Sequence, residues 1–173
     1  MTISSLPKKQ YGVSLIEVLI SVVVFAIGVL GLGGLQIASL KGSSNAHYRT
    51  TASVLAMDLA DRMRSNLKAV SDGRYGEAVS CTTVSRLCRS SACSTDELAI
   101  FDIQEVKCGS KIGTKREGGV VGLLPNGSMT ISCVGGCDQA KAAHDITVSW
   151  SNQKTDHRSS LDQEQSLTIS VIP

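Results

Sequence analysis

Glu17 is the residue of this sequence most clearly placed to do chemistry. It lies near the start of an apolar segment, and no charged residue occurs from Val18 to Leu40. A charge in hydrocarbon costs roughly 3 kcal/mol even on lenient insertion scales, so acids are rare there and usually functional. We therefore expect Glu17 to have a specific task and a positively charged partner.

A basic segment and a glycine precede this acid. Lys8 and Lys9 come before Gly12, and the apolar run begins only after the glycine. Ordinary signal peptides have their cleavage site behind the apolar run, so this arrangement is a different kind of signal. As a helix, residues 18–40 would be about 34 Å long, enough to cross a bilayer. Because basic flanks stay in the cytoplasm, the rest of the chain is expected to be exported.

Six cysteines could supply a second kind of chemistry. They all follow the apolar segment: Cys81, Cys88, Cys93, Cys108, Cys133 and Cys137. An even number of cysteines on the exported side favours disulfides. A metal site is the alternative, but neither close pair has the spacing of a zinc ribbon, and no histidine adjoins either pair. We therefore expect disulfides and no metal.

The pairing of these cysteines is open, because six cysteines allow 15 connectivities. Cys133 and Cys137 can form a local bridge, since Val134-Gly135-Gly136 between them can turn tightly. If Cys88 also pairs with Cys93, then Cys81 remains for Cys108. The sequence does not select this set over the others.

Nothing else in the sequence indicates catalysis. His47, His144 and His157 are isolated among polar residues, so we expect them at the surface. Motifs for a nucleophilic serine, a zinc protease or a phosphate loop are absent from the sequence. The net charge is +2, and without residues 1–12 it is zero, with 15 basic and 15 acidic residues. We expect a protein that is not an enzyme, binds no cofactor and has no nucleic-acid partner.

The periodicity predicts one long helix over residues 14–69. It is apolar all round before Lys41 and amphipathic after it. The apolar stripe of the second half consists of Ala52, Leu55, Ala56, Leu59, Ala60, Met63 and Leu67. Asp58 and Arg62 on the other face form an i,i+4 pair. Asp72-Gly73 is typical of a helix end.

The middle of the chain is mostly irregular. Residues 72–94 are expected to form a loop, and residues 109–119 a glycine-rich link. Between them, Ser94 and Glu97 have the spacing of a capping box, which predicts a short helix that ends at Gly109.

The C-terminal part alternates between apolar and polar residues. Three segments, residues 129–133, 146–150 and 167–171, have this period of two, which predicts an antiparallel sheet with one buried face. The apolar stripe of the long helix is the natural partner of that face. The expected fold class is α+β: a long N-terminal helix, with a transmembrane half and an amphipathic half, packed on a C-terminal antiparallel β-sheet.

The N-terminal segment resembles that of the type IV pilin superfamily. The matching residues are Gly12, the stretch Val13-Ser14-Leu15-Ile16-Glu17 and the apolar run behind them. The resemblance implies that a prepilin peptidase cleaves between Gly12 and Val13 and then methylates the amine of Val13. Phenylalanine is common after the cut, so Val13 departs from the usual pattern. Glu17 would be the buried acid, paired with the amine of Val13 on a neighbouring subunit.

Three further segments resemble the type IV pilus modification proteins of the PilV group, which are minor pilins. They are residues 58–66, the turn Leu124-Pro125-Asn126-Gly127 and the strand Ile146-Thr147-Val148-Ser149-Trp150. The cysteine-rich middle, residues 80–119, matches nothing in that group.

The resemblance implies a minor pilin that primes or supports type IV pilus assembly at or near the tip. Its parts would be a leader (1–12), a transmembrane and filament-core helix (13–40) and a periplasmic domain (41–173), including the amphipathic helix 41–70. It would be a single-pass protein of the inner membrane and later of the pilus. The implied partners are the prepilin peptidase, the major and other minor pilins, the inner-membrane assembly platform and a large tip adhesin. A minor pseudopilin of type II secretion and a pilus-borne adhesive module are the alternatives.

Overall fold

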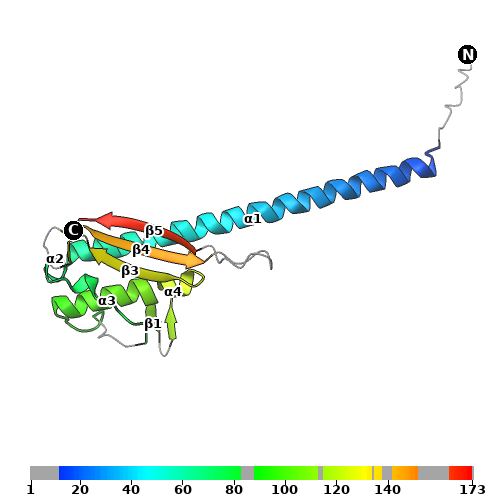
Figure 1. Ribbon diagram of the computed structural model, residues 1–173. Helices are drawn as coiled ribbons and strands as arrows, with labels where there is room; N and C mark the ends of the chain where they lie inside the picture. Colours follow the sequence, from blue (N-terminus) through cyan, green and yellow to red (C-terminus); the bar gives the residue numbers. More distant parts are fainter. Residues whose placement is uncertain are drawn as a thin grey trace, which may run out of the picture. The chain divides into compact units, whose positions relative to one another are not determined.

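The structure is a computed structural model that describes residues 12–82, 88–112, 115–133, 135–137, 142–151 and 164–172 (Figure 1). The chain divides into two compact units, Met1–Ser44 and Asn45–Pro173. Helix α1 (Leu15–Ser65) begins in the first unit and ends in the second. Residues 1–11 of the expected leader, with its two lysines, lie outside the described residues.

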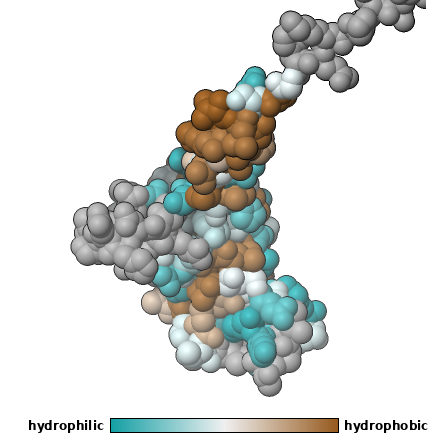
Figure 2. Space-filling view, turned by 90° about the vertical axis from the view of Figure 1, so that its right-hand side faces the viewer, coloured by the Kyte–Doolittle hydropathy of each residue, from teal (hydrophilic) through white to brown (hydrophobic). Residues whose placement is uncertain are grey.

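The described part of the first unit is an apolar helix with its side chains exposed. Within α1, an 18-residue window reaches a mean hydropathy of 2.7 and is not buried by the rest of the chain. Its large apolar side chains form a hydrophobic surface (Figure 2), with Leu15 82% and Leu30 77% exposed. By length and composition, α1 can cross a membrane.

The second unit combines helices with two small sheets. After α1 the elements are α2 (Leu67–Ser71), the 3-10 helix η1 (Arg74–Gly76), α3 (Thr95–Cys108), β1 (Ser110–Ile112), β2 (Lys115–Glu117), α4 (Gly119–Leu123), β3 (Ser128–Cys133), β4 (His144–Ser151) and β5 (Glu164–Val171). β1 and β2 form an antiparallel pair, and β3, β4 and β5 form a second antiparallel sheet in that order.

The larger sheet has the alternation that the sequence predicts. Met129 pairs with Val148, and Val148 with Leu167, so apolar residues of all three strands share one face. Along β4, Ile146, Val148 and Trp150 are buried. The predicted α+β fold, a long helix with a C-terminal antiparallel sheet, is confirmed.

One hydrophobic core joins the elements of the second unit. The second half of α1 contributes small and medium side chains, Ala52, Ala56, Leu59, Ala60 and Met63. The sheet contributes Met129, Ile146, Val148, Trp150 and Val171 to the same core. Small residues on the helix let other elements approach its backbone closely.

The helix does not run to residue 69 as expected. It ends at Ser65, because Asn66 has a non-helical backbone (φ −131°, ψ 54°). The side chains of α2 therefore do not continue the apolar stripe of α1. The side-chain amide of Asn66 donates a 2.8 Å hydrogen bond to the carbonyl of Thr95. Leu67, predicted to be buried, is therefore 56% exposed, while Ala69 and Val70 enter the core.

The short helix after the loop has the predicted start and end. Ser94 and Glu97 form the capping box at the start of α3, and Gly109 follows its last residue. The expected link 109–119 is different, because it contains the β1–β2 hairpin. Gly109 (φ +81°) closes this hairpin, since a Cβ there would lie 2.2 Å from the carbonyl oxygen of Glu117.

Candidate functional site

The residues before α1 form an exposed approach to the helix. Gly12, Val13 and Ser14 have no regular secondary structure and are exposed. The helix is started by Ser14, whose carbonyl accepts hydrogen bonds from the backbone N–H groups of Glu17 (3.0 Å) and Val18 (3.3 Å). No described atom lies within 4 Å of the position of a Cβ on Gly12. The peptide bond between Gly12 and Val13 is therefore accessible to an enzyme.

Glu17 lies in the first turn of α1, five residues after Gly12. A negative charge is stabilised there by the helix dipole, because unpaired N–H groups point out of the N-terminal turn. Its helix neighbours Ile16 and Val18 are apolar and more than half exposed. Within the described residues no ion pair forms with Glu17, so its carboxylate is available to a cation from another molecule.

The six cysteines form three disulfides: Cys81–Cys108, Cys88–Cys93 and Cys133–Cys137. This set is one of the 15 connectivities that the sequence allows. The first bridge joins residues 27 apart in the sequence, whereas the other two join residues 5 and 4 apart. Only the first therefore connects two distant parts of the fold.

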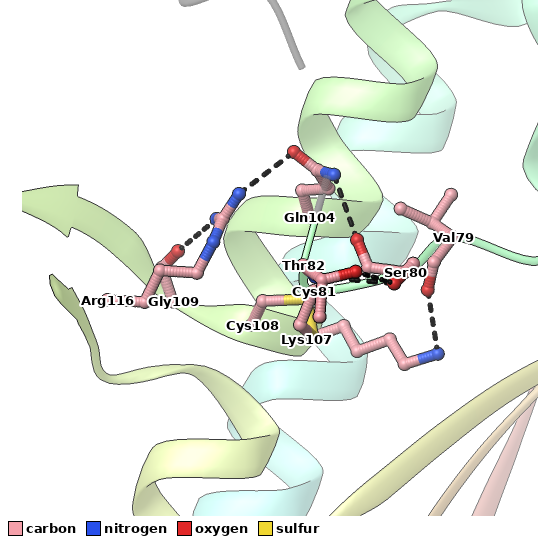
Figure 3. The surroundings of a disulfide bond; sticks show 9 residues. All are labelled: Val79, Ser80, Cys81, Thr82, Gln104, Lys107, Cys108, Gly109 and Arg116. Atoms are coloured by element: carbon pink, nitrogen blue, oxygen red, sulfur yellow. Dashed lines mark hydrogen bonds between the residues drawn. A yellow bond between two sulfur atoms is a disulfide. The ribbon is translucent and has the colours of Figure 1, made fainter. Parts of the chain in front are cut away.

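The Cys81–Cys108 bridge is surrounded by hydrogen bonds that hold the loop 79–82 on α3 (Figure 3). Lys107 donates to the carbonyl of Val79, and Gln104 donates to the carbonyl of Ser80, each at 3.0 Å. Side chains from the last turns of α3 thus satisfy the backbone of an otherwise irregular segment.

Arg116 of β2 extends this network to the hairpin. It donates to the side-chain oxygen of Gln104 and to the carbonyl of Gly109, each at 3.1 Å. The loop, the helix end and the hairpin are therefore linked by one set of polar contacts around the disulfide (Figure 3).

A buried polar cluster connects α1, η1 and α3. Asp102 accepts hydrogen bonds from Tyr75 (2.8 Å) and Arg62 (3.1 Å), and Arg62 also contacts Asp58. Burial raises the pKa of the Asp102 carboxyl, although both hydrogen bonds act in the opposite direction. Burial also raises the pKa of the Tyr75 hydroxyl. The cluster joins three elements of the body.

His144 is not at the surface as expected. Its side chain is fully buried, next to the Cys133–Cys137 disulfide. Cys133 and His144 are direct partners in the β3–β4 register, although they are far from adjacent in the sequence. The alternation of β4 could have indicated this, because His144 has the same parity as the buried Ile146 and Val148. His47 is exposed as predicted, and His157 lies outside the described residues.

The structure thus places the predicted site residues in two separate regions. Gly12, Val13 and Glu17 belong to the first compact unit, and all six cysteines belong to the second. The first region presents an exposed backbone before α1 and an acid in an apolar surface. The second is a covalently fixed body whose described polar groups mostly satisfy one another.

Two family models match neighbouring parts of this chain. Residues 7–33 match the prokaryotic N-terminal methylation motif. Residues 34–104 match the model described as type IV pilin Tt1218. No curated protein and no solved structure matches the chain significantly.

Proposed function

We propose that this chain is a type IV pilin and, more narrowly, a minor pilin. The methylation motif, the pilin match and the helix-and-sheet fold together support the first part of this proposal. In this proposal it primes or supports assembly of a type IV pilus, at or near the tip. Members of such a family are structural proteins, so the function is assembly and not catalysis.

The observation that carries the pilin role is the order of the two matches. The methylation motif covers Gly12, Val13 and Glu17, and the pilin match begins directly behind it at residue 34. In the proposed sequence of events, the prepilin peptidase removes residues 1–12 and methylates the amine of Val13. The exposed backbone around Gly12 is compatible with this cleavage.

Glu17 is then proposed to set the position of the subunit in the filament. Its carboxylate would pair with the amine of Val13 on a neighbouring subunit, inside the apolar filament core. Attraction between the charges is strong at low dielectric, but desolvation offsets much of it, so the main effect is registry. Before assembly, α1 would anchor the chain in the inner membrane, with the body in the periplasm.

The minor-pilin assignment rests on the three segments that resemble the PilV group. In the fold they contribute Met63, Leu124 and Trp150 to one hydrophobic core. The backbone N–H of Ser151 donates a 2.9 Å hydrogen bond to the carbonyl of Pro125, which fixes the turn to the end of β4. Because the three segments contribute to one core, a related protein with the same body would contain all three.

Deletion of the gene, with complementation by the wild type, tests this function. We expect deletion to reduce surface pili strongly, and mass spectrometry of sheared pili from the complemented strain to find methylated Val13. The protein should be far less abundant there than the major pilin. Normal piliation after deletion, with the protein in a type II secretion complex, would instead identify a minor pseudopilin.

A further inference from the structure

The disulfide Cys133–Cys137 and His144 form one corner of the larger sheet. Cys133 ends β3 and His144 begins β4, and the two are register partners. One atom of each residue, the two sulfurs and a ring nitrogen, lies within 4.8 Å of the others. Three side chains that can ligate a metal are therefore gathered at one point.

The ring of His144 is held in a defined tautomer. Its Nδ1 lies 2.9 Å from the carbonyl oxygen of Ala142. A carbonyl only accepts hydrogen bonds, so Nδ1 carries a proton, and in the neutral ring Nε2 then carries the lone pair. The side chain is fully buried, and none of the described residues provides a hydrogen-bond partner for Nε2. An unpaired buried acceptor of this kind destabilises the fold unless a ligand occupies it.

This is the arrangement of a histidine prepared to bind a metal. Ligating histidines usually donate their other ring N–H to a carbonyl or a carboxylate, which fixes the ring and its lone pair. Two thiolates and a neutral imidazole suit thiophilic ions such as Zn²⁺. The carbonyl of Ala142 supplies the outer contact, and His144 supplies the free nitrogen.

We propose that reduction of the Cys133–Cys137 disulfide creates a Zn²⁺ site made of both cysteine sulfurs and Nε2 of His144. A dithiol supplies two electrons and two protons, which break the S–S bond and yield two thiols, while the dithiol becomes a disulfide. Binding of Zn²⁺ then releases the two thiol protons and forms two Zn–S bonds and one Zn–N bond. A water molecule completes the tetrahedral coordination.

The backbone around the corner allows this change. The two sulfurs must move from a bonded distance of about 2 Å to about 3.8 Å, the separation around tetrahedral zinc. The loop between them includes Gly135 (φ 86°) and Gly136 (φ 105°), conformations that glycine adopts without strain. Cys133 and Cys137 are each partly exposed, so solvent reaches the disulfide.

Zinc binding by the full chain in detergent micelles tests the proposal. The chain is reduced with a phosphine, which does not chelate zinc, and titrated with Zn²⁺ against a chromogenic chelator. We expect one tightly bound Zn²⁺ per reduced wild-type chain and none in the oxidised chain. His144→Gln should weaken binding by more than the roughly 10- to 100-fold that the loss of an outer contact costs.

The second local disulfide provides the matched control. The double variant Cys88→Ser/Cys93→Ser removes a similar local bridge, beside which no histidine forms a metal-binding group among the described residues. This variant should therefore retain the tight site. The proposal is overturned if wild type and His144→Gln bind Zn²⁺ equally well. It is also overturned if Cys88→Ser/Cys93→Ser loses as much Zn²⁺ affinity as His144→Gln does. Undiminished affinity in urea would overturn it as well, because that would indicate binding by the unfolded chain. If His144→Gln does not fold, X-ray absorption of the zinc-loaded wild type replaces it. The spectrum must show zinc bound by two sulfurs and one nitrogen, and a zinc ion bound without nitrogen overturns the site.

Discussion

The hydroxyl of Tyr75 donates a 2.8 Å hydrogen bond to a carboxylate oxygen of Asp102, and both side chains are buried. Tyr75 lies in η1 and Asp102 in α3, 27 positions apart in the sequence. Arg62, which lies in α1, donates a hydrogen bond to the other carboxylate oxygen of Asp102. Asp102 therefore holds three elements of the body together through one carboxylate, and this relationship leads to the first two predictions.

Tyr75→Phe should destabilise the body by about 1–3 kcal/mol, because one oxygen of Asp102 loses its partner in the core. Chemical unfolding followed by circular dichroism measures the change. Tyr48→Phe is the matched control, since Tyr48 is only partly buried and no hydrogen bond of its hydroxyl is seen among the described residues. Equal stability of Tyr75→Phe and wild type would contradict the prediction.

The raised pKa of Asp102 should make its contribution to stability depend on pH. The folded state binds this proton more tightly than the unfolded state, so the contribution is fully present below the unfolded pKa of about 3.9. It is lost as the pH rises through the folded pKa. The free energy of unfolding of wild type relative to Asp102→Asn should therefore rise as the pH is lowered from neutral to below 4. Urea midpoints across this range measure it, and a difference that falls on acidification would show the opposite shift.

The Cys81–Cys108 disulfide should stabilise the body more than either local bridge. It joins residues 27 apart in the sequence, whereas Cys88–Cys93 joins residues 5 apart. Chain entropy gives about 3.6 kcal/mol for the first and about 2.1 kcal/mol for the second. Cys81→Ser/Cys108→Ser should thus unfold at a clearly lower denaturant concentration than Cys88→Ser/Cys93→Ser. The reverse order would mean that native contacts around the bridges outweigh loop length.

Gly76→Ala should destabilise the body through the Cys133–Cys137 disulfide. A Cβ on Gly76 would lie 2.6 Å from the sulfur of Cys137, so the bridge or η1 must shift. Overpacking of this kind typically costs about 1–3 kcal/mol. Gly122→Ala is the control, because no described atom lies within 4 Å of its Cβ position in α4. In thermal melting, Gly76→Ala should have a lower melting temperature than Gly122→Ala. Equal melting temperatures would show that the disulfide moves aside at no cost in stability.

Glu17→Ala should block incorporation into the pilus while leaving removal of the leader intact. The substitution removes the carboxylate that is proposed to bind the Val13 amine of a neighbour, but it leaves the bond after Gly12 unchanged. Quantitative mass spectrometry of membranes and of sheared pili measures both steps.

Ser21→Ala is the control for this experiment, because it removes a polar group one turn further along α1. The hydroxyl of Ser21 is already bonded to the carbonyl of Val18 within the helix, at 2.7 Å. Equal amounts of wild type and Glu17→Ala in sheared pili would remove the proposed role of Glu17.

Local chemistry explains the features that could be predicted from the sequence. Ser94 and Glu97 satisfy each other's backbone groups within one turn, so a capping box can be identified without knowledge of the fold. The alternation of β4 is likewise a local pattern, and it identified the buried face of Ile146, Val148 and Trp150. Gly12 and Glu17, at the start of the apolar helix, are likewise part of one continuous sequence motif.

Features that depend on distant contacts could be found only in the tertiary structure. The helix break at Asn66 depends on a hydrogen bond to Thr95, 29 residues away, which competes with continuation of α1. Asp102 is isolated in the sequence, and its partners Tyr75 and Arg62 approach it only when α1, η1 and α3 pack.

The sequence by itself therefore determined the long apolar helix, the methylation motif that includes Glu17 and the α+β class, because each follows from periodicity or from neighbouring residues. The tertiary structure decided that His144 is buried beside Cys133 and Cys137, because the register of β3 and β4 makes Cys133 and His144 partners. Strand register depends on packing of the whole sheet face, and no short segment of this chain contains that information.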